Sequence, residues 1–201
     1  MRLIKIAFVA CLLNIVTTAS AQFVKTNNLL NNSSTWSGLR ASYLPASIES
    51  DGVSVNYTGF QLGYIKSFNI STDIPLFLET GINVSYMTNH AMPNLLSLNV
   101  PINIGYKYVY DGAISVFPYV GLTSKAHLFG NYKGAGDNIN IFDDRLEALG
   151  MKANRFQTGC QVGLTVSYYQ YVAGISYGID FNDFIKGGTF ITPSITLGYN
   201  F

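Results

Sequence analysis

Apolar and polar residues alternate along most of this chain, and the alternation reaches its last residue. In ITPSITLGYNF, residues 191–201, every odd position is apolar or aromatic and every even position is small or polar. Alternation of this kind is typical of a β-strand whose two faces meet different surroundings. We therefore predict an all-β chain with eight strands, at residues 36–45, 54–68, 75–88, 95–110, 113–129, 155–169, 171–183 and 189–201.

The glycines of these segments give a second indication, because all of them share the parity of the polar residues. They are Gly38, Gly59, Gly63, Gly81, Gly105, Gly121, Gly159, Gly163, Gly174, Gly178 and Gly198. A closed eight-stranded barrel has an interior only just wide enough for side chains, which favours small residues inside. The sequence thus predicts an antiparallel up-and-down barrel with a side-chain-filled lumen and the polar parity inward. Leu78, Ile104, Val162 and Leu197 are then outward, and Glu79, Asn103, Gln161 and Gly198 inward.

The predicted connections alternate in length. Those near residues 69–74, 111–112 and 170 are short, whereas 46–53, 89–94, 130–154 and 184–188 are mostly longer. Short periplasmic turns that alternate with longer external loops are typical of outer-membrane barrels. An even number of strands then places both ends of the barrel domain on the periplasmic side.

Two features depart from the regular strand pattern. Pro101, Pro118 and Pro193 fall within predicted strands; because proline removes a ladder donor, we expect bulges or strand ends there. In the longest loop, residues 141–152 predict a short helix, because apolar residues recur at helical spacing. This helix is either a surface that binds a partner or a lid whose apolar side covers the barrel mouth.

The composition agrees with a barrel that spans a membrane. Only 11% of the 201 residues are charged and 48% are hydrophobic, whereas soluble domains carry about 25% charged residues. No apolar run in the body of the chain reaches the roughly 18 residues of a spanning helix. A transmembrane β-barrel reconciles these observations. A soluble lipocalin-like barrel, the alternative fold, would need its apolar residues inside. The net charge of +1 gives no electrostatic basis for binding nucleic acid.

The N-terminus predicts export. Residues 1–21 combine two early basic residues, an apolar stretch and Ala19-Ser20-Ala21, which is typical of a cleaved signal peptide. We expect an Asn-rich segment at 22–35 and the barrel domain at 36–201. After cleavage only Cys160 remains, so no intrachain disulfide forms, and we expect this cysteine to be a small lipid-facing residue.

Aromatic residues gather at the predicted strand ends, as in the interfacial girdles of membrane proteins. The predicted periplasmic girdle contains Tyr64, Phe68, Tyr106, Tyr108, Tyr110, Tyr168, Tyr171, Tyr199 and Phe201. The predicted outer girdle contains Tyr43, Tyr86, Phe156 and Phe181.

Several stretches resemble small PorT-like outer-membrane β-barrel proteins of Gram-negative bacteria. They are GFQLGYIKSFNISTDIPLFLETGINVSY, LNVPINIGYKY, FPYVGL, RFQTGCQVGLTVSYY, GISYGIDF and SITLGYNF. The resemblance implies location in the bacterial outer membrane, with membrane lipid and the barrel-assembly machinery as partners. The ending also resembles the C-terminal insertion signal of such barrels, with Tyr199 and Phe201 at the matching positions. PorT itself is associated with protein secretion, so secretion-system or surface proteins are further candidate partners.

Charged residues with inward parity are the candidate chemistry of the lumen. They are Arg40, Glu79, Lys107, Lys125, His127, Arg155 and Asp180. Glu79 and Lys107 lie near the same end of adjacent predicted strands, so we expect a buried pair. It is either a gate that responds to protons or part of a satisfied polar core.

No catalytic, metal or cofactor site is predicted. The chain has two histidines, and neither belongs to a Ser-His-acid set by spacing. No His, Cys and carboxylate cluster has ligand spacing. We therefore expect a non-enzymatic outer-membrane protein with a structural, adhesion or interaction role through its external loops. A PorT-like component of a secretion system and an outer-membrane lipid-modifying enzyme are the alternatives.

Overall fold

The computed structural model describes residues 35–50, 53–71, 73–89, 93–110, 112–134, 137–143, 153–185 and 187–201. The strands are β1 (Ser37–Ser50), β2 (Val53–Asn69), β3 (Leu76–Thr88), β4 (Asn94–Tyr106), β5 (Tyr108–Tyr110), β6 (Ile114–Gly134), β7 (Asp137–Asn140), β8 (Phe156–Tyr168), β9 (Tyr171–Asp180) and β10 (Thr189–Asn200). The predicted signal peptide at 1–21 and all but the last residue of the segment 22–35 lie outside the described residues.

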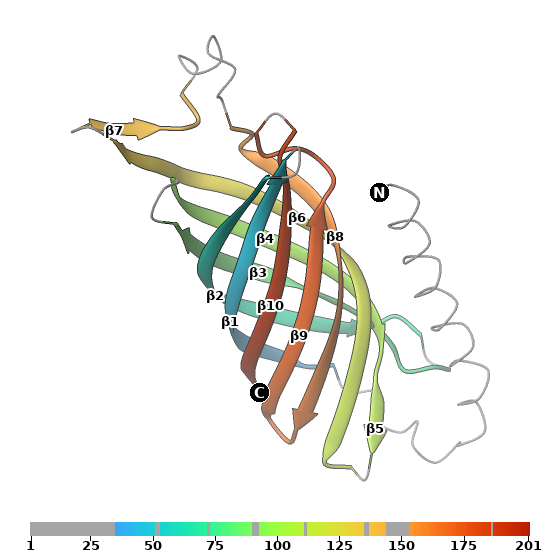
Figure 1. Ribbon diagram of the computed structural model, residues 1–201. Helices are drawn as coiled ribbons and strands as arrows, with labels where there is room; N and C mark the ends of the chain where they lie inside the picture. Colours follow the sequence, from blue (N-terminus) through green and yellow to red (C-terminus); the bar gives the residue numbers. More distant parts are fainter. Residues whose placement is uncertain are drawn as a thin grey trace. The chain divides into compact units, whose positions relative to one another are not determined.

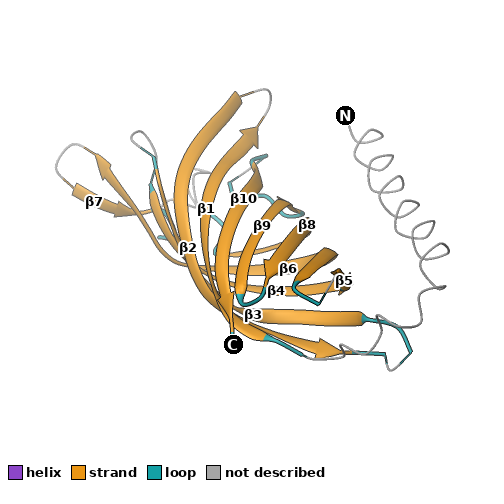
Figure 2. Cartoon of the chain, turned by 90° about the horizontal axis from the view of Figure 1, so that it is seen from below, coloured by secondary structure: helices purple, strands orange, loops and turns teal. Residues whose placement is uncertain are grey.

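Eight of these strands form a closed antiparallel barrel. The ladder runs β1–β2–β3–β4–β6–β8–β9–β10, and β10 pairs with β1 to close the ring. In Figure 1, β1, β10 and β9 pass in front of β3 and β4, and in the view from below the strands curve around a common interior (Figure 2). The predicted eight-stranded up-and-down barrel is therefore confirmed. No helix long and apolar enough to cross a membrane occurs in the described part of the chain.

The two short strands extend β6 beyond the ring. β5 pairs with the first residues of β6, and β7 pairs with its last residues, Asn131 to Gly134. Figure 1 shows β7 at one end of the barrel and β5 at the other. We call the end where β1 begins at Ser37 the terminal end, and the end where β1 stops at Ser50 the loop end.

Several predicted boundaries were wrong. β1 continues to Ser50 because Ala46 and Ile48 keep the inward parity and are buried, so the predicted longer connection at 46–53 shrinks to residues 51–52. The predicted strand at 113–129 runs on to Gly134 and forms a hairpin with β7 inside the predicted loop. Of the predicted helix at 141–152, residues 141–142 form a turn, and residues 144–152 lie outside the described residues.

The assignment of inner and outer faces is confirmed. Ile104 is 45% exposed, whereas its neighbour Asn103 is 3% exposed. The eleven glycines of the predicted strands all share the parity of the inward residues. At nine of them an added Cβ would come within 3 Å of another heavy atom; at Gly63, for example, it would overlap the Asn83 side-chain oxygen. The lumen is packed closely enough to require glycine at these positions.

The expected bulges at prolines were wrong. The irregularity in the β4–β6 ladder lies between Leu96 and Ser97, where Leu128 of β6 is the extra residue. Pro101 lies inside a continuous β4 and pairs with Thr123 of β6, although it and Val100 are not paired with β3. Pro118 lies one residue beyond the last β4–β6 pair. Pro193 pairs in register with Tyr177 of β9. The bulge instead brings both Leu128 and Phe129 to the outer surface.

Candidate functional site: a polar lumen closed at both ends

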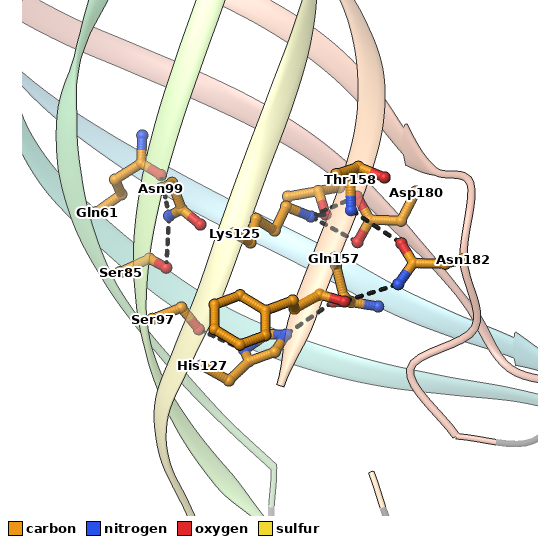
Figure 3. A network of polar contacts seen from close by, with 12 residues as sticks. Gln61, Ser85, Ser97, Asn99, Lys125, His127, Gln157, Thr158, Asp180 and Asn182 are labelled. Atoms are coloured by element: carbon orange, nitrogen blue, oxygen red, sulfur yellow. Dashed lines mark hydrogen bonds and ion pairs between the residues drawn. The ribbon is translucent and has the colours of Figure 1, made fainter. Parts of the chain in front are cut away.

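The middle of the barrel contains a cavity of about 110 Å³, to which all eight barrel strands contribute side chains. Most of these side chains are hydroxyls and amides, because the inward parity of the strands carries Ser, Thr, Asn and Gln. Examples are Ser42, Gln61, Asn83, Asn99, Thr165 and Ser194. Two of the amides are hydrogen-bonded on the inner face. Asn99 Nδ2 of β4 donates to Gln61 Oε1 of β2 at 3.1 Å and to Ser85 Oγ of β3 at 2.9 Å (Figure 3).

Lys125 and Asp180 form a buried ion pair at the edge of this cavity. The Lys125 Nζ lies 2.8 and 2.9 Å from the two Asp180 carboxylate oxygens and 3.4 Å from Thr192 Oγ1 (Figure 3). The two side chains are 12% and 2% exposed. Three partners for the ammonium are what a buried charge requires.

The predicted pair of Glu79 and Lys107 is not formed. Glu79 accepts hydrogen bonds of 3.3 Å each from Trp36 Nε1 and Asn103 Nδ2. Lys107 instead lies over two rings, with its Nζ 4.8 Å from the centroid of Trp36 and 5.9 Å from that of Phe77. The chain leaves the β4 ladder at Lys107, whose N–H donates to the Pro75 carbonyl, so its side chain follows a direction that strand parity does not predict. Burial lowers the pKa of Lys107.

Arg40 and Glu79 both line the cavity, so it contains one further charge of each sign beside the Lys125–Asp180 pair. Its Nη2 donates to Asn200 Oδ1 at 2.7 Å and its Nη1 to the Leu39 carbonyl at 3.0 Å. The bond to Asn200 connects the first barrel strand to the last one. The arginine therefore contributes both to charge balance and to ring closure.

Aromatic rings close the terminal end. Trp36 packs against Phe77 and Phe117, with ring centroids 4.9 and 5.3 Å apart, and Phe117 stacks on Tyr119 at 5.7 Å. Phe77 is fully buried and Phe117 is 4% exposed. Together with the Lys107 side chain, these rings seal the lumen on this side.

An apolar cluster closes the loop end. Its buried members are Ala46, Ile48, Tyr57, Met87, Leu95, Phe142, Ala153, Phe184 and Phe190. Phe142, Ala153 and Phe184 come from the segments that follow β7 and β9, so these connections fold apolar side chains into the barrel mouth. Phe142 is one of the apolar residues at helical spacing in the predicted helix 141–152. The other residues of that apolar side lie outside the described residues.

His127 is buried inside this cluster and has a partner on each ring nitrogen. Ser97 Oγ lies 2.7 Å from Nδ1, and Gln157 Oε1 lies 2.7 Å from Nε2 (Figure 3). Because a side-chain carbonyl only accepts, the network assigns the proton to Nε2 and makes Ser97 the donor to Nδ1. The rings of Phe142, Phe184 and Phe190 surround the imidazole, with centroids 6.0, 5.1 and 6.2 Å away.

The Ser97–His127–Gln157 chain has the contact between a hydroxyl and a base that nucleophilic catalysis needs. Its third member is an amide instead of a carboxylate, and the three side chains are 0%, 2% and 1% exposed. Sequence reasoning missed Ser97 and Gln157. The alternation of the sequence predicts that both side chains point inward. Their position next to His127 depends on the strand register and on the bulge at Leu128, which the alternation does not predict.

The remaining predicted lumen residue, Arg155, lies outside the lumen. β8 begins only at Phe156, so the chain bends at Arg155 and exposes its side chain. Its guanidinium lies 4.7 Å from the Phe142 ring centroid, on the solvent side of the apolar cluster. Of the seven predicted residues, the structure pairs only Lys125 with Asp180. In the described ranges, no three His, Cys, Asp or Glu side chains gather into a metal site.

The outer wall is apolar between two sets of aromatic residues. Those exposed near the terminal end include Tyr64, Phe68, Tyr168, Tyr171, Tyr199 and Phe201. Those exposed toward the loop end include Tyr43, Phe60, Tyr86, Phe156 and Phe181. Cys160 lies on the outward parity between them and is a free thiol.

Comparison with known proteins shows the fold alone. No family model matches the sequence, and no curated protein matches it. Among solved structures, Neisserial surface protein A is 13% identical and covers 82% of this chain and 97% of its own, with a TM-score of 0.52. The outer membrane enzyme PagL is 14% identical and covers 79% and 98%, with a TM-score of 0.50. Ail, the attachment invasion locus protein of Yersinia pestis, is 14% identical and covers 83% and 99%, with a TM-score of 0.46.

Proposed function

We propose that this chain is an integral protein of a bacterial outer membrane, and that its barrel is a closed scaffold for external surfaces with a structural, adhesion or interaction role. The observation that carries the proposal is the inverted distribution of polarity, with apolar side chains outside and hydroxyls, amides and an ion pair inside. A soluble protein rarely exposes an apolar surface of this extent, whereas a lipid-facing barrel requires one.

The height of the apolar wall fits a membrane. Along β2, the outward residues from Phe68 to Phe60 are apolar or aromatic except Lys66, whose Nζ lies 5.4 Å from the Phe68 ring centroid. Beyond Phe60 the outward residues become Thr58, Asn56 and Ser54. For a strand tilted by about 40°, the segment from Phe68 to Phe60 spans about 20 Å, close to the roughly 25 Å apolar band of such barrels.

The barrel continues beyond this band at the loop end. The β1–β2 hairpin extends past the Tyr43–Phe60 pair, and the β6–β7 hairpin extends past the last residues that pair with β8. Polar outward residues and backbone raised above the membrane provide a surface that a partner outside the cell can reach.

The closed lumen argues against a channel or an enzyme. Aromatic and apolar clusters cover the cavity at both ends. A lipid-modifying enzyme would need its nucleophile in reach of lipid, yet Ser97 is completely buried, and three phenylalanine rings surround its partner His127. The Ser97–His127–Gln157 chain therefore serves as a hydrogen-bonded support for the loop-end cluster.

The test begins with location and conductance. The protein should fractionate with outer membranes, should migrate differently on gels before and after heating, and should give no large, steady single-channel currents in planar bilayers. Recovery as a soluble periplasmic protein, or sustained porin-like currents, would contradict the proposal.

Photo-crosslinking in cells then tests the external role. A photoreactive residue at Asn56, beyond the apolar band, should give adducts with other proteins. The matched control at Leu62, on the same strand face within the band, should give lipid adducts only. Protein adducts confined to Tyr110 at the terminal end would contradict an external role and would favour a periplasmic partner, as a secretion component would have.

A further inference from the structure

The seam between the first and last barrel strands has an interrupted ladder. Tyr43 pairs with Ile195 and Ser47 pairs with Ile191 in the same register, but the three residues between them on each strand are not paired. This register places Pro45 directly opposite Pro193. Neither proline has an N–H to donate, so the interruption follows from the sequence.

Pro45 and Pro193 interrupt this seam and not the ladders on their other sides. A shorter gap of two residues on each strand occurs between β3 and β4, at Gly81–Ile82 opposite Val100–Pro101. The β1–β2 ladder is continuous through Pro45, which pairs with Thr58. The β9–β10 ladder is equally continuous through Pro193, which pairs with Tyr177. The missing donors of both prolines therefore weaken the contact between β1 and β10 and no other. Unpaired ladder segments open at lower free energy than paired ones.

The lumen cavity lies directly behind the interruption. Leu44, Thr192 and Ser194, which flank the two prolines on the inner face, all line it. The inner face of the neighbouring strand β9 also has free space beside its glycines. A Cβ at Gly178 would approach other atoms no closer than 3.5 Å and one at Gly174 no closer than 3.2 Å, in contrast to the crowded glycines elsewhere. The roomiest inner-face glycines of the barrel thus lie on β9, the strand that pairs with β10.

The cavity presents acceptors that the protein leaves unused. Asn83 Oδ1 and Asn99 Oδ1 are buried and have no hydrogen-bond partner among the described residues. Both side chains line the cavity and are more than nine-tenths buried, at 6% and 8% exposure. Buried amide oxygens are normally hydrogen-bonded, so a bound molecule with N–H or O–H donors would satisfy these two. The charged residues that line the cavity are two of each sign, Arg40 and Lys125 against Glu79 and Asp180, which favours a neutral molecule.

We propose that the cavity takes up small neutral solutes with N–H or O–H donors, and that they enter sideways between β1 and β10 at Pro45 and Pro193. Axial entry is blocked by the ring cluster around Trp36 at one end and by the cluster around Phe184 at the other. This inference goes beyond the proposed external role, and it does not depend on that role.

The test is alkylation of a cysteine placed in the cavity. Ser194→Cys is introduced with Cys11→Ser and Cys160→Ser, and the folded, membrane-inserted protein is treated with iodoacetamide or iodoacetate. Rates are divided by those of the same protein unfolded in urea. Iodoacetamide, which is small, neutral and carries an N–H donor, should modify the cysteine, and iodoacetate should react at least about tenfold more slowly because of the cost of burying its charge.

Seam variants distinguish the route. Pro45→Val with Pro193→Val restores both donors and should slow iodoacetamide by about tenfold, the scale of one or two ladder hydrogen bonds. If the valine double variant does not fold, Pro45→Ala with Pro193→Ala replaces it. This variant restores the same two N–H donors with smaller side chains and should slow iodoacetamide in the same way. Pro118→Val, on the opposite wall, and Phe184→Ala, in the loop-end cluster, should leave the rate unchanged.

Three results would overturn the proposal: no alkylation of the folded Ser194→Cys protein, equal normalised rates for the two reagents, or a rate that Phe184→Ala raises while the seam variants leave it unchanged.

Discussion

The Lys107 ammonium lies 4.8 Å from the ring centroid of Trp36 and forms the outer layer of the terminal-end closure. Trp36 is the only tryptophan of the chain, so its fluorescence reports on this closure alone. The indole also donates to Glu79, which connects the closure to the polar lumen.

Removing the Lys107 side chain should expose Trp36. In Lys107→Ala, we expect stronger quenching of the tryptophan fluorescence by acrylamide and a loss of about 0.5–2 kcal/mol in the free energy of unfolding, the range of a cation–π contact. Lys66→Ala is the matched control, because Lys66 contacts Phe68 on the outer wall. Equal quenching in both variants would show that Lys107 does not cover the indole.

Breaking the Lys125–Asp180 pair should be among the costliest single changes. Asp180→Asn leaves a buried ammonium without its counter-charge, and we expect a loss of about 3–5 kcal/mol in the free energy of unfolding. The double variant Lys125→Met, Asp180→Leu removes both charges and should recover most of that loss. Urea titration of the protein folded into vesicles measures both. A double variant as unstable as Asp180→Asn would show that the charges are not coupled.

The inner-face glycines should respond differently to alanine. A Cβ at Gly81 would lie 2.9 Å from the Ile65 Cα, a backbone atom that cannot move aside, whereas Gly178 has room. We expect Gly81→Ala to destabilise the barrel by about 1–3 kcal/mol. Gly178→Ala should be neutral or stabilising by up to about 1 kcal/mol, because alanine restricts the unfolded chain. A similar loss at both positions would mean that the lumen has no roomier side at β9.

Period-2 alternation predicted the barrel and the direction of nearly every strand residue, because parity is a local property of the chain. Ile104 outside and Asn103 inside follow from adjacent letters alone. Parity does not predict the direction of side chains at the points where strands begin or end. Arg155 lies just before β8 and Lys107 between β4 and β5, so neither side chain follows the lumen assignment.

Contacts between strands needed more than parity. Ser97, His127 and Gln157 come from β4, β6 and β8, and their meeting depends on two registers and one bulge. A single residue of slip would separate Ser97 from His127. The Pro45–Pro193 juxtaposition has the same origin: Pro45 is the last residue of the predicted strand 36–45, and its position opposite Pro193 depends on the β1–β10 register.

The lipid-facing side can be tested by charge. Ile104→Arg places a charged side chain on the outer wall, and we expect a loss of about 2–4 kcal/mol in folding into vesicles, as at the midplane of other barrels. Thr165→Ser, on the inner face, keeps a hydroxyl in the cavity and should cost less than about 1 kcal/mol. Equal costs would contradict the assignment of the outer wall to lipid.

The Ser97 hydroxyl donates to the buried Nδ1 of His127 at 2.7 Å. Ser97→Ala leaves Nδ1 of His127 without a donor inside an apolar cluster, so we expect a loss of about 1–3 kcal/mol in the free energy of unfolding. Ser42→Ala is the control on the same face; Ser42 shares its hydrogen bond with Thr196 in the polar cavity and has hydroxyl neighbours that offer alternative partners.

The same serine separates a supporting role from a catalytic one. Because Ser97 is completely buried and an amide instead of a carboxylate contacts His127 Nε2, a fluorophosphonate probe should not modify the folded protein. Labelling of the native barrel that disappears in Ser97→Ala would show instead that the cluster opens and that the hydroxyl is nucleophilic. That outcome would replace the scaffold with a lipid-modifying enzyme. The absence of labelling together with the loss of stability would assign Ser97, His127 and Gln157 to support of the loop-end closure.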